Sequence, residues 1–492
     1  MPMKIPKSTK VKALLETLLR GASVTNSERD FGNSGDAEQL SHSNFRRRLV
    51  QDTFNYFLSK VVPGLMGFLS VLVFVRLVGV EQYGRYALVF AFVMASVSGL
   101  AGWLSQGILR FQSQWREPVE AENFLRSAVM GTILSVAVGE IVLAIAIPAF
   151  GVQRGWPLLI SLAFFGVLLV YTVTRARFQA SLRSATVLRF ETVRSIGGFV
   201  IPVVLIWITH SRDYLLLLLG LALGYLLPLF GPIFSRTKTH VVSAHAWRTR
   251  WLGGEEKRIL RQVWGYGWPV ALWLLCQQGL VVSDRYFIQR FLGYSAAGVY
   301  SSMYDTIVRS FSLIFVPITL AVHPLVMNRW NKGERSDALL VISTAFRYQL
   351  LLSVPVCATL YFLAPTVSRL ILGREVPEAT TVVLPLALGG ILWQLAGLAH
   401  KPLEILCQTR RMLLAIFASI FINVAGNIIF IPRFGYRAPA CLTVASSLAY
   451  LLMLFLLTSR VDLRRAVSSS QLQGPAATVP ETTRGLQVSP ND

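Results

Sequence analysis

Charge is scarce in this chain of 492 residues. Charged residues make up 15% of the sequence, against about a quarter in soluble globular proteins. Cysteine is also scarce, and the absence of CxxC or Cys/His spacing excludes a disulfide framework and a zinc site. We interpret the four cysteines as small apolar fillers in separate apolar segments: Cys276, Cys357, Cys407 and Cys441.

Apolar sequence is abundant instead. Hydrophobic residues make up 53% of the chain, and the mean hydropathy is +0.54. Runs of roughly 20 apolar residues are long enough to cross a hydrocarbon layer of about 30 Å as helices. The sequence therefore predicts an all-α polytopic membrane protein with twelve spans, at about 54–75, 87–108, 125–148, 156–174, 191–209, 214–234, 264–291, 298–322, 344–364, 380–399, 412–431 and 438–458.

Acidic residues are few, with 25 Asp and Glu against 47 Lys and Arg, which gives a net charge of +22. If the N-terminus is inside, 32 of the basic residues fall in inner tails and loops and 9 in outer loops. This asymmetry follows the positive-inside rule and predicts that both termini are cytoplasmic. Because no soluble basic domain carries the charge, we do not expect nucleic-acid binding.

A repeated motif indicates an internal duplication. Residues 76–86 and 290–300 share the skeleton R-x-x-G-x(4)-G-x-Y, and an apolar segment runs into and out of each copy. Six apolar segments precede the polar stretch 235–263 and six follow it, so both halves begin on the cytoplasmic side. The sequence therefore predicts two six-helix lobes related as parallel repeats, an organisation found in two-lobed transporters.

The polar segments complete a division into five parts. Residues 11–19 have the apolar spacing of a short amphipathic helix on the inner leaflet, and residues 21–43 have a disordered composition. The basic linker also carries tryptophans, which is typical of a helix at the membrane interface. The parts are a cytoplasmic tail (1–50), an N-lobe (51–235), an interlobe linker (236–263), a C-lobe (264–459) and a disordered cytoplasmic tail (460–492).

Each residue type of the motif has a physical reason. The first glycine suits a left-handed cap at the end of a helix. The second glycine allows the next helix to begin close to the first, and the tyrosine suits the membrane interface, with its ring in acyl chains and its hydroxyl in water. We interpret the motif as architectural, and look for the functional site elsewhere.

The chain resembles the Wzx-type polysaccharide flippases, which belong to the superfamily of the MATE exporters and the lipid II flippase. Residues 55–84, 107–111, 283–301 and 423–436 carry the resemblance, which covers roughly residues 45–460. One departure is the Tyr-Arg-Ala-Pro sequence at 436–439, where such proteins usually have a run of small residues.

The resemblance implies a V-shaped alternating-access transporter in the bacterial inner membrane. It implies a substrate of undecaprenyl diphosphate that bears an oligosaccharide, turned from the cytoplasmic to the periplasmic face. Membrane lipids, H⁺ or Na⁺, and polysaccharide polymerase machinery are further candidate partners. The family performs no covalent chemistry, so we expect no catalytic residue, metal site or cofactor.

Basic residues inside apolar segments are the candidates for binding the diphosphate. Each costs about 2.5–3.5 kcal/mol at the middle of the membrane unless it faces a cavity or a partner. Arg309 lies deepest and has Asp305 one turn before it, which predicts either a self-neutralised pair or a cationic site. Arg285 is a second candidate for the cavity between the lobes.

Two further basic residues lie nearer the inner boundary. Lys60 is six residues into the first segment, where it could bind substrate or extend to inner headgroups. Arg110 ends the second segment and is a candidate for meeting the diphosphate there, although plain anchoring explains it as well. We interpret Arg126 and Arg194 as anchors at the inner boundary.

Two acidic residues are candidates for ion coupling. Glu140 lies in the middle of the third segment without a basic neighbour in sequence, which suits proton or sodium coupling or, alternatively, a protonated structural carboxyl. Asp284 lies beside Arg285, but adjacent residues point about 100° apart on a helix and cannot face the same neighbour.

Two other functions compete with the flippase. A MATE-like cation-coupled drug exporter would need an anionic cavity, whereas Lys60, Arg285 and Arg309 favour anionic cargo. A membrane polymerase or ligase would need catalytic residues in a large outer loop, but the longest outer loop, 365–379, has about fifteen residues and no catalytic constellation.

Overall fold

The computed structural model describes most of the chain, and everything below concerns these residues: 35–115, 117–149, 155–234, 253–374, 376–406 and 408–459. The chain divides into two compact units, Met1–Asp52 and Thr53–Asp492. All packing discussed here lies within the second unit. The amphipathic helix at 11–19, the linker up to residue 252 and the tail from residue 460 fall outside the described residues.

The described regular elements are all helices. The first half of the chain forms α2 (Gly35–Val78), α3 (Val80–Leu100), α4 (Gly102–Phe111), a short 3₁₀ turn (Gln112–Gln114), α5 (Pro118–Ala149), α6 (Trp156–Ala180), α7 (Ser184–Thr209) and α8 (Tyr214–Phe234). The second half forms α9 (Gly254–Asn331), α10 (Arg335–Phe362), α11 (Ala364–Leu372), α12 (Pro377–Ala399), α13 (Lys401–Ile405), α14 (Thr409–Phe434) and α15 (Arg437–Ser459).

The helices match the expected membrane spans. In the described part of the chain, nine helices are long and apolar enough to cross a membrane, and Tyr214–Phe230 is a shorter apolar helix. The two remaining expected spans, 264–291 and 298–322, are the two halves of α9, which carry more polar side chains. The structure therefore confirms an all-α membrane protein with about twelve spans.

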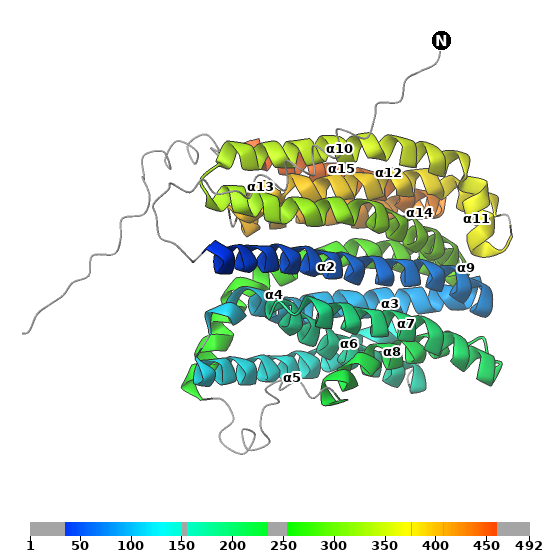
Figure 1. The fold of residues 1–492 in the computed structure, drawn as a ribbon. Helices are drawn as coiled ribbons and strands as arrows, with labels where there is room; N and C mark the ends of the chain where they lie inside the picture. The colour runs from blue at the N-terminus through cyan, green and yellow to red at the C-terminus, as the bar shows by residue number, and fades with distance from the viewer. Residues whose placement is uncertain are drawn as a thin grey trace, which may run out of the picture. The chain divides into compact units, whose positions relative to one another are not determined.

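The helices gather into two groups within the second unit. Figure 1 shows α10, α12, α14 and α15 on one side of α2, and α3 to α8 on the other. Within the groups, α7 packs on α8 and α5 on α6, while α15 packs on both α12 and α14. The main contact between the groups is made by α3 and α4 against α9.

The two motif copies adopt the same backbone turn. Gly79 separates α2 from α3 with φ 84° and ψ 164°, and Gly293 kinks α9 with φ 87° and ψ 176°. A positive φ with an extended ψ is essentially open only to glycine. The structure therefore confirms the need for glycine here, although ψ differs from that of the expected left-handed cap.

The second glycines of the motif bring the two copies together. A β-carbon on Gly84 would overlap the carbonyl oxygen of Tyr294 and lie 2.8 Å from the backbone nitrogen of Gly298. A β-carbon on Gly298 would overlap the carbonyl oxygen of Val80. The role predicted for these glycines, spacing within one hairpin, is thus wrong: they permit backbone contact between the two hairpins.

The tyrosines that end the motif copies are buried, which corrects their expected place at the membrane interface. Tyr86 is 5% exposed and Tyr300 is 1% exposed. A buried tyrosine hydroxyl needs a hydrogen-bond partner, and that of Tyr300 donates to Asp284 Oδ2 at 2.8 Å. The hydrogen bond to Asp284 explains why the Tyr300 side chain points inward. The residue types of the hairpin alone could not reveal this partner.

Helix boundaries differ from expectation at two places. α2 begins at Gly35, inside the stretch 21–43 that composition predicts to be disordered. The sequence Ala-Glu-Gln-Leu at 37–40 consists of good helix formers and favours this earlier start. α9 begins at Gly254, so the last ten residues of the basic linker belong to a transmembrane helix.

Candidate functional site

A cavity of about 250 Å³ lies where α3 meets α9, α12, α14 and α15. The α3 wall is apolar, whereas the other four helices supply most of the polar lining. The polar and aromatic lining consists of Gln277, Gln278, Asp284, Arg285, Tyr304, Asp305, Trp393, Gln394, Asn423, Thr443, Ser446 and Ser447. Both groups of helices contribute to the cavity, and it contains two of the predicted site residues.

Arg285 is the buried cation of this cavity. It is 2% exposed, forms an ion pair with Asp305 and donates from Nη1 to the carbonyl oxygen of Ala87 at 3.0 Å. Asp305 Oδ2 also accepts a hydrogen bond from the Tyr83 hydroxyl at 3.2 Å. The pair therefore connects the two halves of α9 to α3.

The partner of Asp305 bears on two alternatives that the sequence left open for Arg309, a self-neutralised pair with Asp305 or a cationic site. Asp305 pairs with Arg285 across the turn at Gly293, so the pair with Arg309 does not form. The two halves of α9 run side by side in opposite directions after this kink, so residues before and after it can meet. Helical spacing alone describes only neighbours on one helix.

Arg309 lies against α2 rather than in the cavity wall. A β-carbon on Gly67 would overlap the Arg309 guanidinium, which shows that the missing side chain makes room for it. Arg309 is half-buried and, among the described residues, forms no ion pair. Among the described residues, the interface between the groups therefore holds two arginines, Arg285 and Arg309, and one acid, Asp305, bound to Arg285.

Asp284 is the centre of a separate polar cluster. Its carboxylate is buried and accepts hydrogen bonds from Tyr300 Oη at 2.8 Å, Asn423 Nδ2 at 3.0 Å, Asn427 Nδ2 at 2.8 Å and Thr443 Oγ1 at 3.3 Å. Among the described residues no basic group pairs with it. Burial of an unpaired carboxylate is costly, and a proton or a bound cation removes that cost.

The shell of this cluster contains one unused acceptor. Ser283 donates to Asn423 Oδ1, which fixes the orientation of that amide, and Asn427 Nδ2 also reaches the same oxygen at 3.1 Å. Asn427 Oδ1 is buried without a hydrogen-bond partner among the described residues. Carboxylate and amide oxygens are the ligand types that hard cations prefer.

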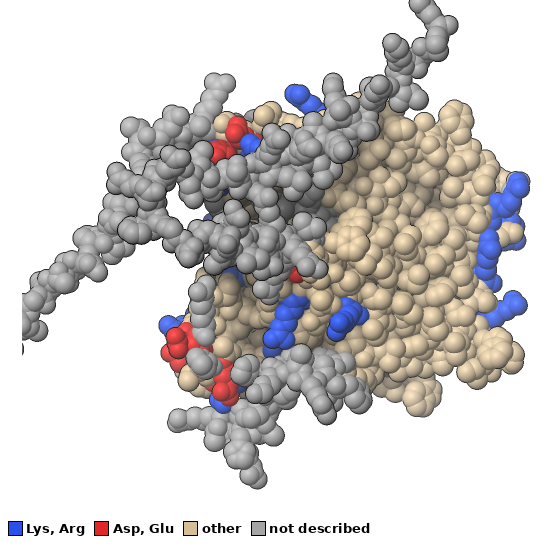
Figure 2. All heavy atoms as spheres, viewed as in Figure 1, with Lys and Arg blue, Asp and Glu red and all other residues tan. Residues whose placement is uncertain are grey.

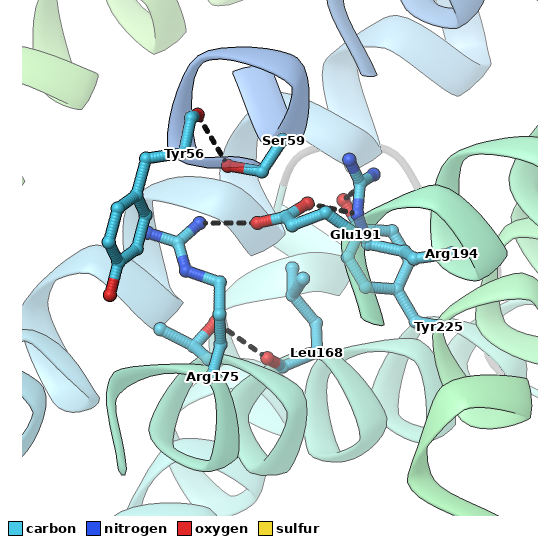
Figure 3. A network of polar contacts seen from close by, with 8 residues as sticks. Tyr56, Ser59, Leu168, Arg175, Glu191, Arg194 and Tyr225 are labelled. Atoms are coloured by element: carbon cyan, nitrogen blue, oxygen red, sulfur yellow. Dashed lines mark hydrogen bonds and ion pairs between the residues drawn. The ribbon is translucent and has the colours of Figure 1, made fainter. Parts of the chain in front are cut away.

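A second cluster of charges lies within the first group of helices (Figure 3). Glu191 on α7 is 4% exposed and pairs through Oε1 with Arg175 Nη1 and through Oε2 with Arg194 Nε, each at 3.0 Å. Arg194 Nη1 also donates to the Tyr225 hydroxyl on α8 at 3.2 Å. Lys60 lies on α2 next to Ser59, in the part of that helix that packs against the cluster: Asn55 Nδ2 donates to Ser184 Oγ on α7 at 3.1 Å. Arg194 is therefore part of an internal network, which corrects its interpretation as an anchor.

The remaining predicted residues lie outside the cavity. Arg110 at the end of α4 is exposed, with its guanidinium carbon 4.6 Å from the ring centre of Tyr266. Glu140 faces α6, where its Oε1 would lie 3.3 Å from a β-carbon on Gly166. Arg126 forms an ion pair with Glu122 at 2.8 Å. Of the predicted site residues, Asp284 and Arg285 thus line the cavity, whereas Arg110 and Glu140 lie away from it.

Sequence reasoning missed two parts of these clusters. Glu191 and Arg175 lie nine residues after and seven residues before Leu182, where the chain turns between α6 and α7. This hairpin register places them at similar depth and could have indicated the pair. By contrast, Asn423 and Asn427 could be assigned to one helix face, but nothing in the sequence indicated that they meet Asp284.

The match to known families comes from the first two thirds of the chain. Residues 49–329 match the family described as polysaccharide biosynthesis protein. The chain belongs to this family. The match begins just before the first membrane span and ends with α9, so it includes both motif copies, Asp284, Arg285 and the Glu191 cluster. Membership confirms the resemblance to Wzx-type flippases.

Solved structures confirm the fold. An inward-facing multidrug resistance MATE family transporter of the MOP superfamily has a TM-score of 0.66 at 14% identity, covering 85% of this chain and all of that one. The lipid II flippase MurJ in an inward closed conformation has a TM-score of 0.63 at 14% identity, covering 87% of this chain and 94% of that one. An outward-facing MATE transporter has a TM-score of 0.59 at 16% identity, covering 87% and 97%.

No curated protein matches the chain. At these low identities the solved structures establish the architecture alone, which is that of a two-lobed membrane transporter. We therefore call the helices up to α8 the N-lobe and those from α9 the C-lobe. Family and fold together show that the chain is a multi-pass membrane protein of the polysaccharide biosynthesis family with the architecture of MATE transporters and MurJ.

Proposed function

We propose that this protein flips undecaprenyl-diphosphate-linked oligosaccharide across the bacterial inner membrane for surface or exopolysaccharide assembly. The diphosphate must cross a layer that rejects charge, while the isoprenoid chain can remain in lipid. The observation that carries the proposal is the pair of arginines between the lobes. Arg285 lines the central cavity, and Arg309 lies against α2 without an acidic partner among the described residues.

The cavity lining supports a sugar as the other part of the cargo. Gln277, Gln278 and Gln394 supply amide donors and acceptors, and Trp393 supplies an aromatic surface. Amides bind hydroxyl groups in both senses, and an indole packs on the apolar face of a sugar ring. In this proposal the arginines bind the diphosphate, and the glutamines and Trp393 bind the sugar, within one interface between the lobes.

The small volume of the central cavity implies that the lobes must separate before cargo enters. Pockets for ligands of drug size have about 300–1,000 Å³, and the cavity has about 250 Å³. An oligosaccharide linked to a diphosphate is larger than this. We propose that the glycine contact between the motif copies at Gly84 and Gly298 opens and closes during alternating access.

We propose that Asp284 couples the cycle to an ion. Its carboxylate lies at the cavity, has no basic partner among the described residues and adjoins the unused oxygen of Asn427. Either H⁺ or Na⁺ satisfies this arrangement. Glu140 is the second candidate, although it lies between α5 and α6 and away from the cavity.

The excess of basic residues in inner loops supports cytoplasmic termini, so that cargo enters from the side on which it is assembled. Polysaccharide polymerase machinery on the outer side is the proposed consumer. Arg110, at the inner end of α4, is proposed to meet the diphosphate on entry.

The alternative is a cation-coupled exporter of small molecules, and one observation favours it. The cavity contains two acids, Asp284 and Asp305, and only Asp305 is paired with an arginine. A cationic drug could therefore bind at Asp284. The two functions predict opposite cargo charge, which makes them separable.

The test uses cells that lack the chromosomal copy of this protein. Cells complemented with the wild-type chain should display surface polysaccharide, while Arg309→Ala should remain in the membrane and leave lipid-linked repeat units on the inner side. Normal surface polysaccharide with Arg309→Ala, together with increased sensitivity to cationic drugs in cells without the protein, would favour the exporter.

A further inference from the structure

The charge cluster inside the N-lobe is unbalanced. Two bases, Arg175 and Arg194, bind one acid, Glu191, and a third base, Lys60, lies on the part of α2 that packs beside them. The three bases come from α2, α6 and α7, and Figure 3 shows Arg175, Glu191 and Arg194 together with Tyr56 and Ser59 of α2 beside them. None of the four residues lines the central cavity. The cluster therefore carries an excess of two positive charges at a site that the central cavity does not include.

Glu191 is shared between the two arginines. One carboxylate oxygen accepts from Arg175 and the other from Arg194, and the side chain of Glu191 is 5% exposed. Lys60 forms no ion pair with the part of the chain that is described. The remaining guanidinium groups and the Lys60 ammonium keep donors that this carboxylate does not use.

The depth of these bases makes the imbalance costly. Lys60 lies six residues beyond Phe54 and Arg194 ten beyond Ser184, which is about 9 Å and about 15 Å along helices that rise 1.5 Å per residue. A base at such depth normally faces a cavity, an acid or an anion. Lys60 on its own could extend to inner headgroups, but Arg175 and Arg194 turn toward Glu191 and not toward the boundary.

The cluster is also accessible from one side. Lys60 is exposed, and the side chains of Arg175 and Arg194 are 36% and 17% exposed. Figure 2 shows basic side chains on the face of the molecule at the level of the N-lobe helices. Access therefore decreases from Lys60 to Arg175 to Arg194, with Glu191 at the closed end.

We propose that Lys60, Arg175 and Arg194 form a second anion site, which holds the diphosphate of the lipid-linked substrate before it reaches the central cavity. This rests on the proposed function. Guanidinium groups bind phosphate oxygens through paired N–H donors, and an ammonium adds a point charge. Glu191 holds the two guanidinium groups in place and limits the excess charge, so that the anion can leave again.

Phosphate chemistry has two sources at this membrane face: the diphosphate of the substrate and the phosphodiester of an anionic phospholipid. A diphosphate presents more charge and more unesterified oxygens than a phosphodiester does. The site should therefore prefer a prenyl diphosphate over phosphatidylglycerol, and competition between the two distinguishes the sources.

The experiment measures binding of farnesyl diphosphate to the full-length protein in phosphatidylcholine nanodiscs by isothermal titration calorimetry. Lys60→Ala should weaken binding roughly fivefold to tenfold, the effect of one lost charge-assisted contact. Lys60→Arg should keep the affinity. Glu191→Gln should tighten binding, because it removes the negative charge, whereas a purely structural role of the cluster would make this variant bind more weakly.

Arg347→Ala is the matched control, because Arg347 is an exposed base within α10 in the other lobe and belongs to neither site. It should bind as the wild type does. The proposal is overturned if Lys60→Ala binds as tightly as the wild type, if Glu191→Gln weakens binding, or if an equal amount of phosphatidylglycerol displaces the diphosphate.

The same titrations separate this proposal from the proposed function. If Arg309→Ala weakens binding and Lys60→Ala does not, the central site stands and the second site is wrong. If the wild-type protein binds no prenyl diphosphate at all, anionic cargo itself is wrong, and both proposals fall.

Discussion

The N-lobe and the C-lobe share a backbone plan but hold charges of opposite sign. The N-lobe cluster combines three bases with one acid, Glu191, whereas the C-lobe cluster has one acid, Asp284, held by neutral donors. With the offset of 214 residues between the motif copies, Lys60 corresponds to Leu274 and Asp284 to Ser70. Neither cluster is thus a copy of the other: the duplication kept the hairpins, and the charges differ position by position.

The two lobes share glycines at positions where no other residue fits. Gly79 and Gly293 have the same positive φ, and Gly84 and Gly298 meet the backbone of the opposite copy. Charged side chains, by contrast, can be exchanged wherever a partner or water satisfies them. The comparison therefore separates architecture, which is common to both lobes, from chemistry, which is specific to each.

The largest expected effect on export comes from breaking the shared part. Gly84→Ala and Gly298→Ala each place a methyl group on a carbonyl oxygen of the backbone, which cannot move aside as a flexible side chain can. Overpacking of this kind costs about 1–3 kcal/mol. Both variants should lower the thermal unfolding midpoint of the purified protein and abolish surface polysaccharide.

The control for these variants is Gly397→Ala on α12. A β-carbon there would meet no heavy atom within 4 Å. Replacing glycine by alanine inside a helix should stabilise the protein by about 0.5–1 kcal/mol. An unfolding midpoint for Gly84→Ala as high as that of Gly397→Ala would show that the hairpins do not pack as described.

The next effect distinguishes a paired from an unpaired arginine. Arg285→Ala leaves Asp305 without its ionic partner, and breaking a buried ion pair costs about 3–5 kcal/mol. Arg309→Ala should reduce export but change stability little. Chemical denaturation of the two variants measures this difference, and the double variant of Arg285 and Asp305 to Ala should recover part of the lost stability. Equal destabilisation by the two single variants would contradict it.

The charged residues of the site also show which features the sequence alone predicts. The number of spans follows from run lengths, and the repeat follows from glycines that tolerate no substitute. Arg285 and Asp284 stand out because charge is rare in an apolar segment. The partners of these two residues cannot be identified from the sequence. The pairing of Arg285 with Asp305, for example, depends on the register of α9 after its kink at Gly293.

A similar reason explains the misplaced motif residues. The hairpin at 76–86 reads as a surface turn because a glycine and a tyrosine are common at membrane interfaces. Burial comes from the second hairpin, 214 residues away, and no local pattern reports such a contact. Only the repetition of the same skeleton in both halves indicated that the two hairpins share one environment.

A smaller effect tests ion coupling. Asp284→Asn keeps the shape and one of the two acceptor oxygens of the side chain but removes its charge, so export should lose its dependence on the ion gradient. Glu140→Gln makes the same chemical change outside the cavity and should keep that dependence. Surface polysaccharide measured with and without a proton or sodium ionophore distinguishes the two. Loss of the dependence in Glu140→Gln alone would move the coupling site into the N-lobe.

The smallest expected effect concerns a contact that only one motif copy makes. The guanidinium carbon of Arg85 lies 4.3 Å from the ring centre of Tyr294, whereas the position equivalent to Arg85 in the second copy is Val299, which cannot form such a contact. A cation–π contact at a partly exposed site contributes about 0.5–1 kcal/mol. Arg85→Lys should keep part of this, and Arg85→Ala should lower the unfolding midpoint slightly while export continues. Because the glycine contact between the hairpins remains in both variants, a loss of export in Arg85→Ala would show that the two lobes are held together by this side chain more than by their backbones.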